Sequence, residues 1–210
     1  HGVDASRFSS AAVAELSEAE RSEIEKLKPY VLSVGALKPR KGYRYSLAAF
    51  AEVQRSQPAL RYVIVGDGDR RGIDSEIQRL GVTGRVSVFK NVSRDFLVGL
   101  YRNAELFILL PNDDRGDVEG FGLVFLEAAA SSLPVIAARS GGAEDAVRDG
   151  KNGFLVPPQN AEAAAGAMRR VLSDSVLRRR LADCSLEFAN MMSWNRVAQQ
   201  YYETYQRLIR

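Results

Sequence analysis

The stretch "GDVEGFGLVFLEAAASSLPVIAARSGG" (residues 116–142) decides how this chain is interpreted. An apolar segment follows Gly122, and two glutamates, Glu119 and Glu127, lie eight residues apart around its start. A helix that begins near Gly122 places Glu127 in its first turn and leaves Glu119 in the preceding loop. Both carboxylates can then face one cleft together with the free N–H groups of the helix N-terminus. The alternative is a solvated Glu119 and a surface Glu127 on a helix with different limits.

Short apolar runs on both sides of this stretch predict a sheet. Most runs are continuously apolar rather than alternating, which is typical of parallel strands covered on both faces. Helical patterns separate them, so we expect right-handed crossovers and helices on both faces. The predicted fold class is α/β, a Rossmann-like parallel sheet of about six strands with extra C-terminal helices. The runs are residues 30–35, 61–66, 85–89, 105–110, 134–138 and 153–156.

The two ends of the chain differ from this alternating pattern. The opening "HGVD" predicts a loop, and residues 11–27 predict a polar helix. After Val156 only helical patterns remain, and three helices fit them, the last beginning near Ser193 with an aromatic face. We therefore divide the chain into a linker with an N-terminal helix (1–28), a Rossmann-like domain that would hold the ligand site (29–192) and a final helix (193–210).

Composition excludes several classes of protein. The 210 residues carry 29 Lys and Arg against 26 Asp and Glu, and no basic block suggests a nucleic-acid partner. Cys184 is the only cysteine, so an internal disulfide is not available. No run approaches the ~18 apolar residues of a spanning helix. We expect a cytoplasmic protein, with any contact to the inner membrane face made peripherally through a preceding part of the protein.

Glycines and cations follow the predicted strands, at the edge where parallel sheets bind ligands. Small residues let a ligand approach the backbone, so these loops predict a pocket for an anion, above all a phosphate. Each loop alone is also ordinary turn chemistry, and neither the P-loop nor the dinucleotide fingerprint is present. The acidic stretch "NDDRGD" misses the EF-hand spacing, so we expect no metal site. The loops are residues 35–42, 66–70, 90–93, 111–122 and 139–142.

The ordered set of motifs resembles retaining glycosyltransferases of the GT-B fold, especially glycosyltransferase family 4. "EGFGLVFLE" followed by "AAASSLPVIAARSGG" is similar to the E-x7-E region of that family. "HGVD", "VLSVGALKPRKG", "YVIVGDGD" and "SWNRVA" resemble its other motifs, in the same order along essentially the whole chain.

The resemblance implies the C-terminal, donor-binding half of a two-domain enzyme. An N-terminal acceptor-binding domain of the same protein would precede it, and the last helix would cross back toward that domain. Such enzymes transfer a hexose from a nucleoside-diphosphate sugar to a glycan, lipid or small-molecule acceptor, as in polysaccharide or glycolipid biosynthesis. They need no metal ion or other cofactor, and the isolated half is expected to be inactive.

The resemblance also assigns roles to positions. Glu127 matches the glutamate that holds the donor ribose, and Glu119 matches the one near the hydroxyls of the transferred sugar. Lys41 matches the lysine that neutralises the diphosphate, so Glu119 and Lys41 are the expected catalytic residues. The other expected donor contacts are Gly35, Ala36, Gly66, Asn91, Val92, Gly120, Phe121, Gly122 and Leu123.

Two departures from the family pattern bear on affinity and on the choice of base. Ala36 stands where the family often has an arginine that binds the diphosphate. In this loop Lys41 is left to neutralise the diphosphate, with Arg40 or Lys38 as an additional cation. Lys90 stands where glycine is common and is expected to alter the approach to the base.

Other functions stay open on the sequence. A non-catalytic nucleotide-binding module would use the same loops without turnover. A GT-B-like sugar-nucleotide epimerase would act without an acceptor, and a phosphorylase would carry pyridoxal phosphate on a lysine.

Overall fold

A computed structural model describes residues 1–8, 16–114, 116–117 and 119–209. Its centre is one six-stranded sheet in the order β3-β2-β1-β4-β5-β6, and every neighbouring pair is parallel. The α/β prediction is confirmed, and the strand limits differ from the apolar runs by at most a residue at each end. The strands are β1 (Tyr30–Val34), β2 (Arg61–Val65), β3 (Val86–Phe89), β4 (Leu106–Leu109), β5 (Val135–Ala138) and β6 (Gly153–Val156).

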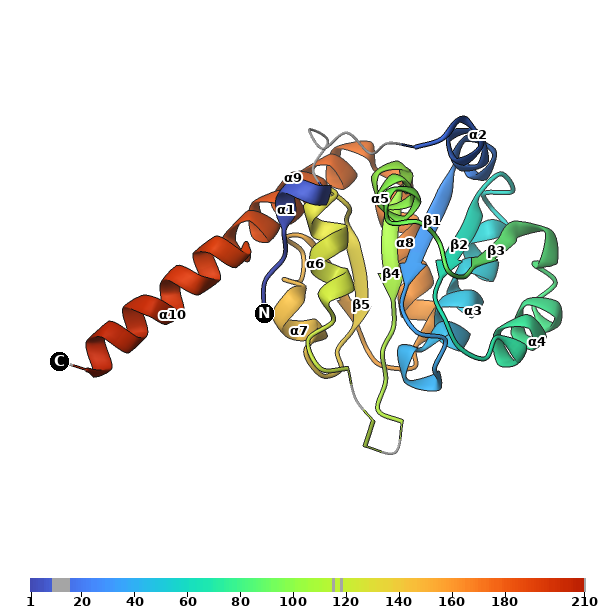
Figure 1. Ribbon diagram of the computed structural model, residues 1–210. Coiled ribbons are helices and arrows are strands. Elements are labelled where there is room, and N and C mark those ends of the chain that lie inside the picture. The colour runs from blue at the N-terminus through green and yellow to red at the C-terminus, as the bar shows by residue number, and fades with distance from the viewer. Residues whose placement is uncertain (9–15, 115, 118, 210) are drawn as a thin grey trace.

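Helices cover both faces of the sheet, as Figure 1 shows. On one face α3 packs against α4 and α8; on the other lie α2, α5 and α6, with α1 and α9 against α6. This double cover explains the continuously apolar strands, because β1, β4 and β5 are buried at every position. The helices are α1 (Ala5–Phe8), α2 (Glu18–Leu27), α3 (Tyr43–Gln54), α4 (Arg71–Arg79), α5 (Arg94–Asn103), α6 (Leu123–Ala130), α7 (Ala143–Ala146), α8 (Ala161–Ser173), α9 (Ser175–Met191) and α10 (Trp194–Leu208), and the short 3-10 turns are η1 (Pro39–Lys41) and η2 (Thr83–Arg85).

The strand order reverses at β1, which pairs with β2 on one side and β4 on the other. The crossover from β1 to β2 passes through α3 on one face of the sheet, and the crossover from β4 to β5 passes through α6 on the other face. The loops that follow β1 and β4 therefore diverge at the carboxyl edge. Such a switch point is where open α/β sheets bind ligands. This edge lies at the bottom of Figure 1, where the loop after β4 projects.

The predicted N-terminal helix starts later than expected. The helix α2 begins at Glu18, not near residue 11, and residues 9–15 lie outside the described part of the chain. A capping box fixes this start: the backbone N–H of Glu20 donates to Oγ of Ser17 at 3.2 Å, and the Ser17 N–H donates to Oε2 of Glu20 at 2.9 Å. The opening loop is as predicted, and Val3 exchanges backbone hydrogen bonds with Met192 and Trp194.

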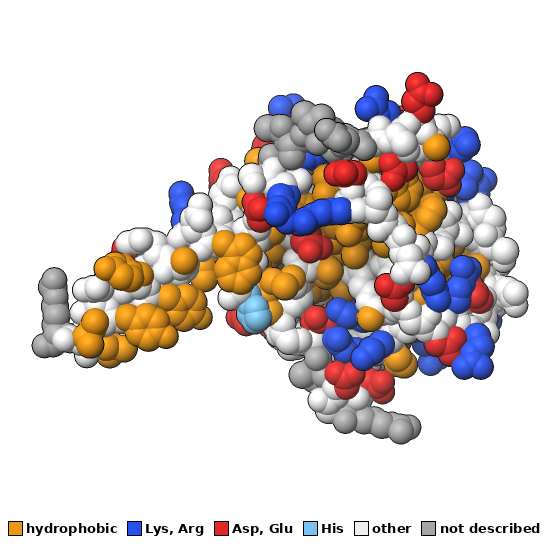
Figure 2. Space-filling view, viewed as in Figure 1, with side chains coloured by type: hydrophobic (Ala, Val, Ile, Leu, Met, Phe, Trp, Pro, Cys, Tyr) orange, Lys and Arg blue, Asp and Glu red, His pale blue; other side chains and the backbone are white. Residues whose placement is uncertain are grey.

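Three helices follow β6, as the sequence predicted. The last, α10, extends away from the body of the molecule (Figure 1) and carries a row of hydrophobic side chains along one side (Figure 2). Among the described residues, no helix combines the length and apolar character needed to cross a membrane. The exposed large hydrophobic residues of α10 and its end are Trp194, Tyr201, Tyr202, Tyr205, Leu208 and Ile209.

Candidate functional site

Two hydrogen bonds from neighbouring segments fix the loop after β1. The hydroxyl of Tyr43 donates to the carbonyl of Gly35 at 2.7 Å. The backbone N–H of Asn112, in the loop after β4, donates to the carbonyl of Arg40 at 2.9 Å. Between these anchors η1 turns the side chain of Lys41 inward, where a Cβ on Gly35 would lie 3.5 Å from Lys41 Nζ. The sequence-predicted Gly35 and Lys41 therefore meet at the switch point.

A buried ionic cluster joins this loop to the one before α6. Oε2 of Glu119 lies 2.6 Å from Lys41 Nζ and 2.7 Å from Arg40 Nη1. The side chains of Lys41 and Glu119 are each 8% exposed, and that of Arg40 is 18% exposed. Arg40 Nε also lies 3.2 Å from Asp117 Oδ1, without hydrogen-bond geometry. Two cations thus converge on one carboxylate oxygen.

The backbone of the loop before α6 rests against the turn after β5. The N–H of Gly142 donates to the carbonyl of Glu119 at 3.1 Å. A Cβ on Gly142 would lie 1.9 Å from the carbonyl oxygen of Gly120 and 2.6 Å from Cα of Phe121, closer than any real contact. Only glycine allows this approach, so the "RSGG" turn shapes the Glu119 loop rather than simply starting a helix.

The N-terminus of α6 opens at the same place. Gly122 precedes it with φ of 73°, and a Cβ there would meet the ring of Phe125 at 2.5 Å. No side chain caps this helix, and Leu123 in its first turn is 44% exposed. Uncapped N–H groups with the positive end of the helix dipole are suited to an anion. The ring of Phe121 stacks on His1 at 4.8 Å.

Glu127 lies in the second turn of α6, so its predicted place in the first turn is wrong although the helix starts where expected: Glu127 is the fifth residue counted from Leu123. Its Oε2 accepts a hydrogen bond from the hydroxyl of the buried Tyr101 at 2.8 Å. Burial raises the pKa of Glu127, while the Tyr101 hydrogen bond and the charge of Arg94 oppose the shift. Its partner Tyr101 lies on α5, the helix that follows the loop after β3, so Glu127 faces that helix.

That loop contains the residues expected to border the base. Asn91 is exposed with φ of 51°, and Val92 is half-buried against the core. Lys90, the departure from the family pattern, donates from Nζ to the carbonyl of Gly68 at 2.6 Å. The lysine therefore links the loops after β3 and β2. In the loop after β2, a Cβ on Gly66 would lie 1.9 Å from the carbonyl oxygen of Gly35, so the loops after β2 and β1 are in contact.

The structure brings most of the predicted residues to one edge in two groups. Gly35, Lys41, Glu119 and Gly122 form the first group, and a Cβ on Gly122 would lie 3.6 Å from Cγ of Glu119. Glu127 belongs to a second group with Tyr101. Within the described residues, the side chains of Glu119 and Glu127 share no hydrogen-bond or ion-pair partner. Ala36 is half-buried beside the first group and Gly120 is exposed.

Sequence reasoning missed the partners of these residues. The hydroxyls of Tyr101 and Tyr43 each contact a site residue, yet neither tyrosine is among the expected site residues. A buried tyrosine usually finds a hydrogen-bond partner, which is the only signal that pointed to them. Among the described residues, no group of three or more His, Cys, Asp or Glu side chains could hold a metal ion.

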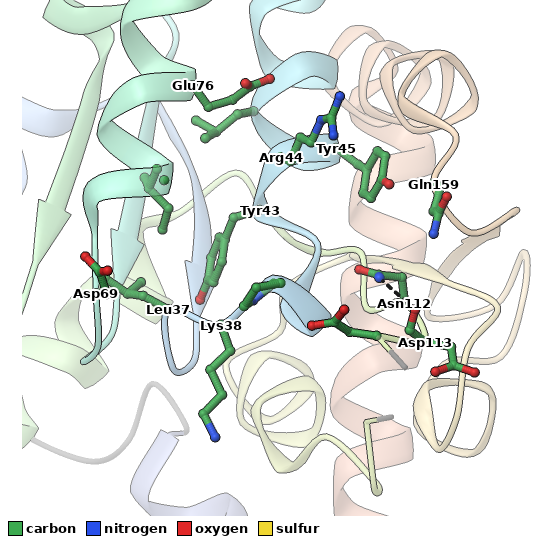
Figure 3. A pocket seen from close by; sticks show the side chains of 15 residues that line it. Leu37, Lys38, Tyr43, Arg44, Tyr45, Asp69, Glu76, Asn112, Asp113 and Gln159 are labelled. Atoms are coloured by element: carbon green, nitrogen blue, oxygen red, sulfur yellow. Dashed lines mark hydrogen bonds between the residues drawn. The ribbon is translucent and has the colours of Figure 1, made fainter. Parts of the chain in front are cut away.

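A cleft of about 590 Å³ lies on the α3 and α4 side of the η1 turn (Figure 3). Of the carboxylates that line it, Asp69 and Glu76 are paired with Arg71 and Arg79, outside the lining, and Asp113 and Asp114 belong to the loop after β4. None of the predicted donor-binding residues lines it. Tyr43 and Asn112 do line it and reach the carbonyls of Gly35 and Arg40, so this side of the turn supports the site from behind. The labelled residues in Figure 3 are Leu37, Lys38, Tyr43, Arg44, Tyr45, Asp69, Glu76, Asn112, Asp113 and Gln159.

A parallel sheet with this strand order, and with glycines, the buried Lys41 and the N-terminus of α6 at its switch point, has a Rossmann-like architecture. Residues 16–185 match the family model "Glycosyl transferases group 1". The chain belongs to this glycosyltransferase family.

Known proteins agree with that assignment. A GDP-mannose-dependent alpha-(1-6)-phosphatidylinositol monomannoside mannosyltransferase of Mycolicibacterium smegmatis is 34% identical over 177 residues, which are 82% of this chain and 46% of that protein. Sucrose-phosphate synthase from Thermosynechococcus elongatus superimposes with a TM-score of 0.80 at 28% identity, over 99% of this chain and 51% of that one.

A third match shares the fold. The Anabaena protein HepE in complex with UDP has a TM-score of 0.82 at 24% identity, over 98% of this chain and 56% of that one. The GT-B-type fold expected from the motifs is thereby confirmed. The chain spans about half the length of these proteins.

Proposed function

We propose that this chain is the donor-binding half of a retaining glycosyltransferase of the GT4 type. The full protein would transfer a hexose from a nucleoside-diphosphate sugar to a glycan, lipid or small-molecule acceptor. The observation that carries the proposal is the buried cluster of Lys41 and Glu119 beside the uncapped N-terminus of α6. It puts a cation, free N–H groups and a carboxylate together at the switch point of the sheet.

Each part of a nucleotide sugar has a matching group at this edge. The diphosphate would accept hydrogen bonds from Lys41 and from the first N–H groups of α6. The sugar hydroxyls would donate to Glu119, which is buried beside Lys41. The ribose hydroxyls would donate to Glu127, whose orientation is fixed by Tyr101. The base would lie against Val92.

The chemistry needs stabilisation of the leaving diphosphate. As the bond between sugar and diphosphate breaks, negative charge grows on the phosphate oxygens. A preorganised ammonium and a helix N-terminus stabilise such charge without reorganisation. The η1 turn places Lys41 beside Gly35 at the switch point before the donor binds. In this proposal Glu119 orients the sugar and forms no bond to it, and no metal ion takes part.

The partner would be an acceptor-binding domain of the same protein. The relatives are about twice as long as this chain, and α10 exposes Trp194, Tyr201 and Tyr205. A contiguous apolar face of this kind marks an interface. We assign α10 to the contact with that domain, together with the opening segment, which is hydrogen-bonded to the start of α10 through Val3. Any peripheral membrane contact would also lie in that domain.

The relatives suggest which donors to test. The mannosyltransferase above is described as GDP-mannose-dependent, and HepE was solved with UDP. A thermal-shift panel of UDP-, GDP- and ADP-sugars should raise the melting temperature of this chain for the donor that it binds. Full-length protein should then turn over that donor, and a Glu127→Ala variant should not. If the full-length protein binds the donor but does not turn it over, the result would contradict the proposed glycosyltransferase activity and would favour a non-catalytic nucleotide-binding module.

A further inference from the structure

We propose that Arg40 is a positioning residue that holds Glu119 for the sugar, and not a second cation for the diphosphate. The inference rests on the proposed function and goes beyond it, because it gives the two neighbouring cations different tasks. With Ala36 in place of the usual arginine, Arg40 is the obvious substitute phosphate ligand. The geometry points to another role.

Both cations bind the same oxygen of Glu119. Arg40 Nη1 lies 2.7 Å and Lys41 Nζ 2.6 Å from Oε2, while no described residue donates a hydrogen bond to Oε1. A donor diphosphate that binds Lys41 competes with Glu119 for its ammonium. A buried carboxylate that lost its only cation would be strongly destabilised. Arg40 removes this penalty, since it still holds Oε2 and leaves Oε1 for a sugar hydroxyl.

Arg40 also contacts a second carboxylate. Its Nε lies 3.2 Å from Asp117 Oδ1, so its guanidinium is flanked by two acidic side chains. Its carbonyl is tied to the N–H of Asn112. A guanidinium with a rigid fork suits the fixing of a carboxylate, whereas the single ammonium of a lysine exchanges partners more readily. The pair therefore divides into one fixed cation and one exchangeable cation.

Calorimetry with this chain separates the two roles. The probes are UDP against UDP-glucose and GDP against GDP-mannose, because the member of each pair without the sugar reports the diphosphate contact alone. We expect Arg40→Met to weaken binding of the sugar nucleotide about tenfold and to change binding of the matching diphosphate less than about threefold. Glu119→Gln should show the same selective loss, and the double variant no further loss. Arg40→Lys should restore part of the affinity if Arg40→Met proves unstable.

The outcomes are distinguishable. Equal loss for the diphosphate and its sugar would make Arg40 a phosphate ligand and overturn the positioning role, with the donor site intact. Equal affinity of wild type and Glu119→Gln for the sugar nucleotide would show that Glu119 contributes nothing to the sugar, and would also overturn it. Wild-type chain that binds neither pair would instead contradict the proposed function.

Discussion

Nζ of Lys41 lies 2.6 Å from Oε2 of Glu119, and each side chain is only 8% exposed. The two residues come from the loops after β1 and β4, the neighbouring strands between which the strand order reverses. Their ion pair therefore closes the switch point of the fold. Because Arg40 shares the same oxygen, two cations meet one buried carboxylate, and the other carboxylate beside Arg40, Asp117, is 59% exposed.

This asymmetry makes the two partners unequal for stability. Glu119→Ala leaves two cations facing each other in a buried site, so we expect a loss of about 3 kcal/mol in the free energy of unfolding. Lys41→Met leaves Glu119 paired with Arg40, and the loss should be about 1 kcal/mol. Urea unfolding of both variants checks the order, and a larger loss for Lys41→Met would contradict it.

The close approach at Gly142 gives a purely steric prediction. Gly142 has an ordinary φ of −70°, but an added Cβ would lie 1.9 Å from the carbonyl oxygen of Gly120. Gly142→Ala should displace the Glu119 loop, weaken nucleotide binding and destabilise the fold by about 1–3 kcal/mol. Gly166→Ala is the matched control, because a Cβ added at Gly166 would have no neighbouring atom within 4 Å and Gly166 lies inside α8. The control should gain about 0.5–1 kcal/mol. Equal stability of the two variants would refute the packing argument.

The hydrogen bond from Tyr101 to Glu127 can be removed without changing the shape of the core. Tyr101→Phe deprives a buried carboxylate of its donor, so we expect a loss of about 1.5–3 kcal/mol at neutral pH. The pKa of Glu127 should rise further, because this hydrogen bond lowers it. Thermal or urea unfolding measures the loss. An unchanged stability at pH 7 would mean that the bond is not made in solution.

Glu127 also predicts a pH dependence. Its pKa in the folded chain is raised from the ordinary value of 4.5, mainly by burial. Below 4.5 the carboxyl is protonated in both states and costs nothing. As the pH rises from 4.5 through the folded pKa, the unfolded chain ionises more easily, and stability is lost.

The comparison that isolates this effect is wild type against Glu127→Gln. The free energy of unfolding of the wild type, minus that of the variant, should fall as the pH rises through this window and stay flat above it. Urea unfolding at several pH values measures the difference. A difference that grows with pH would reverse the sign of the shift and contradict the burial of Glu127.

Much of the fold could be predicted because the strands are covered on both faces. A run such as "YVLSV" is apolar throughout, so its limits in the sequence nearly coincide with β1. The meeting of Lys41 and Glu119 could also be expected, since the carboxyl ends of parallel strands share one edge. The start of α2 was missed although Ser17 and Glu20 have the spacing of a capping box.

Other features were not readable from the sequence. Tyr101 and Glu127 lie on different helices, and only the packing of α5 and α6 on one face brings them together. Arg40 was one of three nearby cations, and the sequence did not distinguish its contact with Glu119 from a phosphate contact. Such pairings depend on side-chain directions at the edge of the sheet, which periodicity does not encode.

The most direct test is the binding of UDP and GDP by calorimetry to wild type, Lys41→Ala and Lys38→Ala. Lys38, which the sequence offered as a helper of Lys41, is exposed and lines the cleft on the α3 and α4 side of η1, so it serves as the control. We predict that one diphosphate binds the wild type and Lys38→Ala alike, and that Lys41→Ala weakens it by about 1.5–3 kcal/mol, tenfold or more. Equal affinity of wild type and Lys41→Ala, or no binding of either diphosphate, would contradict a donor site at this edge of the sheet.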